Sequence, residues 1–249
     1  MSYNSDGNRD KMTGQFAVPF TFPFSMVAWG KKDATGWAKL GDEKLLMLNN
    51  DTVSLDDGFA IINRGAPDEL SAASWNFSGA RQQASESHPD GTYDDIWVVM
   101  VATYLNDSER IIYVEDAANT SLDTDNAVTS ALVEFIAIGG ATQSDFQQWS
   151  GLLAEIALFN IVLNTTQVDA LQTGSGAGPQ PNSIAPNQCI GYWPLIEDKA
   201  FHQDESGNGG PTLTVEDSMP FSSDHPTIAL TLDLHLPIYS KSNLTYLRR

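Results

Sequence analysis

The sequence contains little cysteine, little positive charge and no long apolar run, and each shortage excludes a class of protein. Cys189 is the one cysteine among 249 residues, so a disulfide framework within the chain is impossible. The 13 lysines and arginines are outnumbered by 32 aspartates and glutamates, which disfavours nucleic acid and anionic membrane surfaces as partners. No stretch reaches the roughly 20 apolar residues that a membrane helix needs.

Motifs for catalysis are missing as well. Hydrolysis of a glycosidic bond requires two carboxylates at a fixed separation, and no strand-like segment carries such a pair. Glu155 stands alone in its segment, and the adjacent Glu115 and Asp116 point to opposite sides of a strand. No Gly-x-Ser-x-Gly elbow and no Cys/His metal spacing occurs. We therefore expect a protein that binds and does not catalyse.

The sequence does contain many short apolar segments that are typical of strands. We expect them over residues 24–29, 45–48, 58–62, 96–104, 110–114, 134–138 and 150–160. In the last segment Leu152 and Ile156 are predicted on one face and Leu153 and Phe159 on the other, with Glu155 as the exposed exception. A short helix is expected near 165–172, capped by Asn164 and Gln167.

The order of these segments resembles a known family. The first part, Glu134-Phe-Ile-Ala-Ile-Gly-Gly140, is followed by a loop and then by Gly151-Leu-Leu-Ala-Glu-Ile-Ala-Leu-Phe-Asn160 and the capped helix. This arrangement resembles laminin-G-like domains of the concanavalin A-like superfamily, over roughly residues 20–215. The resemblance implies an all-β protein, a two-sheet antiparallel sandwich of the jelly-roll kind. The family includes lectins, adhesion modules, virion proteins and enzymes, so it implies a fold more strongly than a function.

The predicted domain organisation has three parts. Residues 1–15 are expected to form a leader, residues 16–221 the sandwich, and residues 222–249 an extended arm with a strand over 227–238. In that strand every second residue is apolar, which predicts one buried face that either its own domain or another chain must cover. We favour a partner-docking strand, with these apolar residues: Ile228, Leu230, Leu232, Leu234, Leu236 and Ile238.

Two kinds of binding site are candidates. Carbohydrate-binding modules stack sugars on aromatic rings beside amide groups, which suggests Trp149 with Gln148, Trp75 with Asn76, and also Trp37 and Tyr93. Calcium prefers carboxylate and amide oxygens, and two groups supply them: Asp123, Asp125 and Asn126, and Asp204 with Asn208. Turn-forming Asp and Asn also bond their own backbone, and buried aromatic anchors are common, so both structural alternatives stay open.

The polar N-terminus has no basic segment or apolar run typical of a secretory signal. Two later segments, Gly191-Tyr-Trp-Pro-Leu195 and Asp204-Glu-Ser-Gly-Asn-Gly209, resemble segments of bacterial and phage members of the family. Together with the added strand, this resemblance favours a structural protein on the virion surface. We expect it to dock on other virion proteins or on identical subunits through its C-terminal arm, and to display the sandwich to glycans. The alternatives are a stand-alone calcium-dependent lectin and a glycan-cleaving enzyme.

Overall fold

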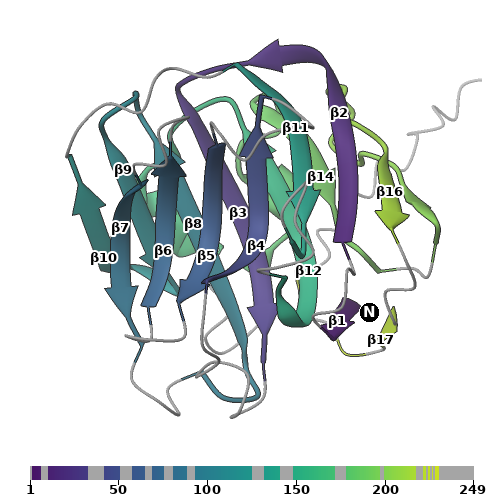
Figure 1. Cartoon of the computed structure of the whole chain (residues 1–249), viewed down its shortest axis with the longest axis horizontal. Helices are drawn as coiled ribbons and strands as arrows, with labels where there is room; N and C mark the ends of the chain where they lie inside the picture. The colour runs from purple at the N-terminus through teal and green to yellow at the C-terminus, as the bar shows by residue number, and fades with distance from the viewer. Residues whose placement is uncertain are drawn as a thin grey trace, which may run out of the picture.

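A computed structural model gives the fold of the chain. It describes residues 2–6, 11–32, 42–50, 58–64, 69–75, 81–88, 93–124, 132–140, 148–171, 178–196, 199–216, 221–222, 224, 226 and 228–229. Two antiparallel sheets lie face to face and form a sandwich (Figure 1). The all-β fold class predicted from the sequence is therefore confirmed.

Sheet A has eight strands, in the order β10-β9-β8-β3-β12-β1-β17, with β14 also paired to β12. The bounds are β1 (Ser2–Asp6), β3 (Phe24–Lys31), β8 (Trp97–Tyr104), β9 (Arg110–Val114), β10 (Asp116–Asp123), β12 (Ser150–Phe159), β14 (Cys189–Trp193) and β17 (Phe221–Ser222). Strand β3 is buried over seven of its eight residues. Central strands covered on both sides read as continuous apolar runs, which is why the sequence located β3, β8 and β12 well.

Sheet B also has eight strands, in the order β15-β16-β2-β11-β4-β5-β6-β7. The bounds are β2 (Lys11–Phe20), β4 (Asp42–Asn49), β5 (Gly58–Arg64), β6 (Glu69–Trp75), β7 (Arg81–Ser87), β11 (Val133–Ile138), β15 (Phe201–His202) and β16 (Leu213–Glu216). Strand β7 is mostly polar, and the sequence did not predict it because apolar alternation is weak there.

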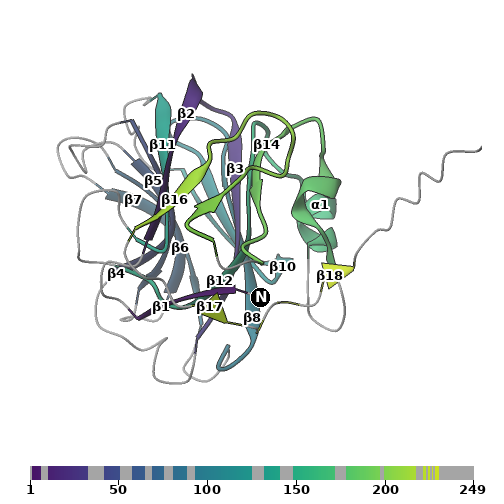
Figure 2. The same cartoon turned by 90° about the vertical axis from the view of Figure 1, so that its right-hand side faces the viewer.

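Two short helices lie outside the sandwich, and Figure 2 shows α1 (Thr165–Ala170) against the outer side of sheet A. Asn164 and Gln167 form the predicted capping box, in which each side chain accepts a hydrogen bond from the other residue's backbone N–H, at 3.0 and 2.9 Å. The second helix, α2 (Pro181–Ile184), begins with a proline at its first position and was not among the elements predicted from the sequence.

The main core lies between the sheets. It contains the fully buried Trp149 and Trp193 and, at one end of the sandwich, a group of aromatic rings around Phe24. A second cluster joins the outer side of sheet A to α1 and contains Trp29, Leu163, Val168 and Cys189. Cys189 is fully buried in this cluster, and burial raises the pKa of its thiol to about 12, so its contacts are those of a core residue.

Strand β12 contains a bulge that interrupts the alternation predicted from the sequence. Its pairing with β3 changes register between Ala154 and Ala157, and Glu155 adopts a left-handed φ of 53°. The side chains of Leu153 and Ile156 therefore both lie in the core between the sheets, whereas the sequence predicted them on opposite faces of the strand. The expected exposure of Glu155 is wrong too, because it is only 2% exposed and accepts a hydrogen bond from the hydroxyl of Tyr192.

A buried polar network joins the two sheets at one end. The ammonium of Lys32, just after β3, pairs with the carboxylate of Glu43 in β4 and lies 4.3 Å from the ring centroid of Trp149. Glu43 also accepts hydrogen bonds from Ser150 of β12 at 2.7 Å and from Asn63 of β5 at 3.2 Å. Charged groups from both layers thus meet in the buried interior.

The first and last described segments both pair with other parts of their own chain. Residues 2–6 form β1 beside β12, and residues 11–15 begin β2, so the region predicted as a leader contributes two strands. Strand β17 pairs with β1, and β18 (Ile228–Ala229) pairs in parallel with β13 (Gly178–Pro179). The start of the predicted C-terminal arm is therefore bound to its own chain.

Replacement of Lys32 by methionine tests the buried network. Lys32→Met leaves the Glu43 carboxylate buried without its cation, which we expect to lower the free energy of unfolding by about 3–5 kcal/mol. Lys31→Met is the matched control, since Lys31 pairs with Asp224 at 2.8 Å where both side chains are partly exposed, and such pairs contribute about 1 kcal/mol or less. Urea denaturation measures both variants, and equal losses would contradict a special role for the buried pair.

Candidate functional site

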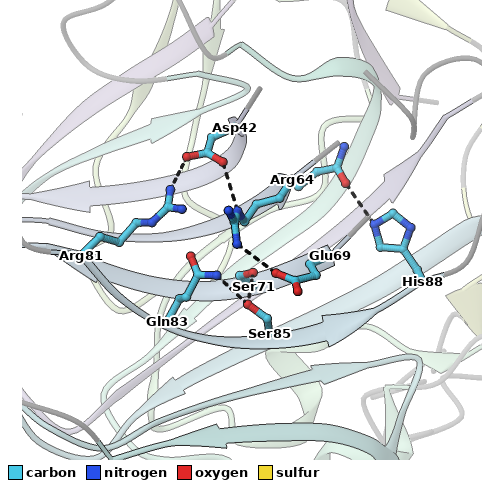
Figure 3. Close-up of polar contacts among 9 residues, drawn as sticks. Asp42, Arg64, Glu69, Ser71, Arg81, Gln83, Ser85 and His88 are labelled. Atoms are coloured by element: carbon cyan, nitrogen blue, oxygen red, sulfur yellow. Dashed lines mark hydrogen bonds and ion pairs between the residues drawn. The ribbon is translucent and has the colours of Figure 1, made fainter. Parts of the chain in front are cut away.

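The outer face of sheet B is the candidate site. Strands β4 to β7 place alternate side chains on this face, and the cross-strand partners Asp42 and Arg64, and Arg64 and Glu69, lie side by side there. Figure 3 shows these side chains converging with Arg81 of β7. The sequence did not identify this group, because its members come from four strands and have no common spacing.

Ion pairs connect Asp42, Arg64, Glu69 and Arg81, and Lys44 lies in the electrostatic field of Asp42 and Arg81. We call these five residues the arginine cluster. The guanidinium of Arg64 lies 3.4 Å from Asp42 and 3.0 Å from Glu69, and Arg81 pairs with the other oxygen of Asp42. The side chains of Arg64 and Arg81 are 25% and 32% exposed. Both arginines are thus held by carboxylates while they stay accessible from solvent.

Lys44 extends the cluster toward Trp75. Its ammonium lies 4.9 Å from the centroid of the Trp75 ring, a cation–π arrangement. Burial lowers the pKa of Lys44 to about 8, and Asp42 opposes this shift while Arg81 adds to it. The cluster therefore contains three neighbouring cations, Lys44, Arg64 and Arg81.

A row of neutral polar groups lies next to the arginine cluster (Figure 3). The hydroxyls of Ser71 and Ser85 are 2.7 Å apart, and the amide nitrogen of Gln83 donates to Ser85 at 2.9 Å. The amide oxygen of Gln83 is buried and has no hydrogen-bond partner. This row offers hydroxyl and amide groups of the kind that bind sugar hydroxyls.

The middle of the same face is apolar and closed. Its residues are buried, so they do not form an open platform: Met47, Ala60, Ile62, Ala73, Trp75 and Ala137. The accessible parts of the face are therefore at its two sides.

A hollow of about 410 Å³ lies on the other side of the face, and we call it the β16 hollow. Its walls come from β2, β11, β16 and the residue just before β16, and they include Gln15, Phe135, Thr212 and Thr214. On its floor the hydroxyl of Thr13 donates to Glu216 at 2.7 Å. An aromatic ring beside hydroxyl, amide and carboxylate groups makes a mixed surface suited to a saccharide.

The aromatic residues predicted to stack on sugars lie mainly in the interior. Trp149 is fully buried and its ring N–H donates to the carbonyl of Leu152 at 3.2 Å, while Gln148 is 3% exposed. Trp75 is 8% exposed and packs under Lys44. Tyr93 is half-buried, with its ring 5.9 Å from that of His88. Trp37 and Asn76 lie outside the described residues.

The predicted calcium ligands that can be placed bond other protein groups. Asp123 accepts a hydrogen bond from Arg110 at 2.6 Å. Asp204 accepts from three backbone N–H groups, those of Tyr192, Ser206 and Gly210. Asn208 donates to the carbonyls of Pro186 and Cys189. Asp125 and Asn126 lie outside the described residues.

These contacts give Asp204 and Asn208 the turn-stabilising role named above as the alternative. Within the described parts of the chain, no three His, Cys, Asp or Glu side chains gather as metal ligands.

Of the predicted docking strand, the structure describes Ile228, whose backbone pairs with Gly178. The other docking residues lie outside the described residues: Leu230, Leu232, Leu234, Leu236 and Ile238. Among the described helices, none is long and apolar enough to cross a membrane.

Glu115 is a partly buried carboxyl group outside the candidate face. It lies at the turn between β9 and β10 with a left-handed φ of 67°, and it accepts a hydrogen bond from the backbone N–H of Val99 at 2.9 Å. Burial raises its pKa to about 7, and Asp116 adds to the shift while the Val99 bond opposes it. Glu115 does not line the β16 hollow. Its carboxylate and its backbone N–H both bond the backbone of Val99 in β8, so its contacts are structural.

Comparison with known proteins finds similar folds but no similar sequence. No protein-family model matches this sequence, and no curated protein matches it. A solved structure from Bacteroides ovatus, for which carbohydrate binding has been suggested, matches with a TM-score of 0.54 and 13% identity over 90% of this chain and 61% of that one. The present chain thus spans less than two thirds of that protein.

Two further structures match at similar levels. A heptameric pentraxin from Limulus polyphemus has a TM-score of 0.51 and 12% identity over 87% of this chain and 100% of its own. Domain 4 of an extracellular arabinanase from Geobacillus stearothermophilus, in complex with arabinotriose, has a TM-score of 0.50 and 14% identity over 68% of this chain and 74% of its own. At these identities the likeness shows the fold alone, a two-sheet β-sandwich.

The pH dependence of stability tests the burial of Glu115. Because the pKa is raised from 4.5 to about 7, the folded state binds more protons than the unfolded state between these values, so stability falls as pH rises through them. The loss is on the order of 3 kcal/mol for a shift of this size. Glu115→Gln keeps the acceptor for Val99 and removes the charge. We therefore expect the variant to gain stability over the wild type from pH 5 to pH 8 in chemical denaturation, and a constant difference would contradict the assignment.

Proposed function

We propose that this protein is a non-catalytic carbohydrate-binding sandwich that holds saccharides on the outer face of sheet B. The observation that carries the proposal is the β16 hollow, in which the ring of Phe135 lies among hydroxyl and amide side chains. A sugar has both C–H faces and hydroxyl groups, so it needs apolar contact and hydrogen bonds within one small area. The hollow of about 410 Å³ has room for one to a few sugar units.

The fold and the described carboxylates support binding over catalysis. Two of the matching chains are described in terms of carbohydrate, one as a suggested binder and one as a domain in complex with arabinotriose. A glycosidase of the two-carboxylate kind needs both groups to face one cleft. In the β16 hollow Glu216 is the acidic side chain, and it is engaged by Thr13 and by Lys11 at 3.4 Å.

The finer proposal is that the sandwich is a structural subunit on a virion surface. The alternating apolar residues from Ile228 to Ile238 supply one face for pairing with an identical subunit or another virion protein. Since β18 and Asp224 are attached to the sandwich, a strand that continues from them would connect it firmly to a neighbour. The competing proposal is a free lectin that uses calcium.

Saccharide binding is tested by a glycan array followed by calorimetry with the highest-ranked oligosaccharide. We expect Phe135→Ala and Gln15→Ala to weaken binding about fivefold each, since each removes a contact worth about 1 kcal/mol. Leu122→Ala is the control, because Leu122 is 56% exposed on β10 of the other sheet. If Phe135→Ala and Gln15→Ala both bind as tightly as the wild type, the saccharide site lies elsewhere. If a chelator abolishes binding, the calcium-dependent lectin is favoured.

Assembly is tested by removing the residues after Ala229. A chain of residues 1–229 keeps β17 and β18 and loses the remaining alternating segment. We expect this shortened chain to be a folded monomer and the full chain to form a larger assembly. Light scattering gives the mass of each. The double variant Leu232→Asp, Leu234→Asp in the full chain controls for the change in length. A full chain that is itself monomeric at high concentration would argue against the docking strand.

A further inference from the structure

The arginine cluster differs in charge from the chain as a whole. The sequence has 13 basic and 32 acidic side chains, yet on this face Lys44, Arg64 and Arg81 gather around two carboxylates, Asp42 and Glu69. The cluster therefore carries a small positive excess on a protein whose net charge is −19. An anion that is repelled by most of the surface is attracted at this place.

The cluster also has the geometry that recognises carboxylates. The planar guanidinium groups already pair with the carboxylates of Asp42 and Glu69, which occupy the positions that a ligand carboxylate would take or share. Arg81 is the most exposed of the basic groups in these pairs, at 32% of its side chain. Its remaining N–H donors are the ones an incoming anion reaches first.

Neutral groups beside Arg81 suit the rest of a sugar. Gln83 lies two residues further along the same face of β7, and its amide oxygen lacks a donor. Buried acceptors without a donor are costly, and a sugar hydroxyl is a donor of the right kind. The hydroxyls of Ser71 and Ser85 continue this row. An acidic group and hydroxyl groups on one molecule would match the surface.

We infer that sheet B has a second binding place, at the arginine cluster, for an acidic saccharide of the uronic-acid class, whose carboxylate is received by Arg81 in the field of Arg64 and Lys44. This inference goes beyond the saccharide site proposed at the β16 hollow, because the closed apolar middle of the face lies between the two. The carboxylate pairs with the outer N–H groups of Arg81, while Lys44 supports it from below beside Trp75. The hydroxyl groups of the ring then bond the row formed by Gln83, Ser85 and Ser71.

The experiment compares each acid with its own neutral derivative. Oligomers of galacturonic, glucuronic and mannuronic acid are titrated alongside their methyl esters, which keep the sugar and remove the charge. We expect at least one acid to bind tenfold or more tightly than its ester at low salt, and Arg81→Gln to remove this preference while ester binding persists. Arg81→Lys, which keeps the charge but not the planar fork, should retain part of it.

A pH series adds a second readout that does not depend on the folding of an arginine variant. Burial, helped by Arg81 and opposed by Asp42, lowers the pKa of Lys44 to about 8, and a bound carboxylate favours its charged form. Affinity for the acid should therefore fall between pH 7 and pH 9 in the wild type, and this fall should be absent in Lys44→Gln.

The outcomes separate the two proposals. Equal binding of acids and esters in the wild type would overturn the acidic class and leave saccharide binding in place. A preference for the acid that survives Arg81→Gln and shows no pH dependence near 8 would place the carboxylate elsewhere and overturn the assignment to this cluster. Failure of the acids, the esters and all neutral oligosaccharides to bind would remove the proposed function itself.

Discussion

The buried pair of Lys32 and Glu43 is the interaction on which the alignment of the two layers depends. A charged pair between the sheets is stable only with good geometry and further hydrogen bonds, because both ions have lost their water. Here Asn63 and Ser150 supply those bonds from β5 and β12. A shift of either sheet by one residue would separate the ions, whereas apolar side chains tolerate such shifts far better.

This network extends toward the candidate site through the strands themselves. Glu43 faces inward between Asp42 and Lys44, which both face outward into the arginine cluster. Asn63 likewise precedes Arg64, and its amide oxygen lies 3.1 Å from the ring of His88. Because successive residues of a strand point to opposite faces, the same three-residue stretch of β4 fixes the inner network and the outer cluster together.

Much of the fold could be predicted from local patterns. The apolar strands of sheet A and the capping box at Asn164 follow from spacing that is visible in the sequence. The bulge at Glu155 could not be predicted, since a left-handed glutamate breaks the alternation without any glycine to mark it. The polar strand β7 was missed for a similar reason, because sheet pairing with β6 and not apolar alternation holds it in place.

The candidate site was harder to predict than the fold. Trp149 was selected because it lies beside polar residues in the sequence, but the fold turns it into the main core, where Lys32 covers its ring. Arg64 and Arg81 have no special neighbours in the sequence, and their meeting at Asp42 depends on the order of four strands. Side chains brought together by long-range pairing leave no local signal.

The pairing of β1 with β17 has a consequence for how nature or an engineer could use this sandwich. Tyr3 and Phe221 are direct cross-strand partners, so their α-carbons are about 5 Å apart. Strand β1 is also paired with β12 on its other side. An engineer who shortens the chain at residues 2–6 would therefore leave β17 without its partner in sheet A and expose an edge of β12.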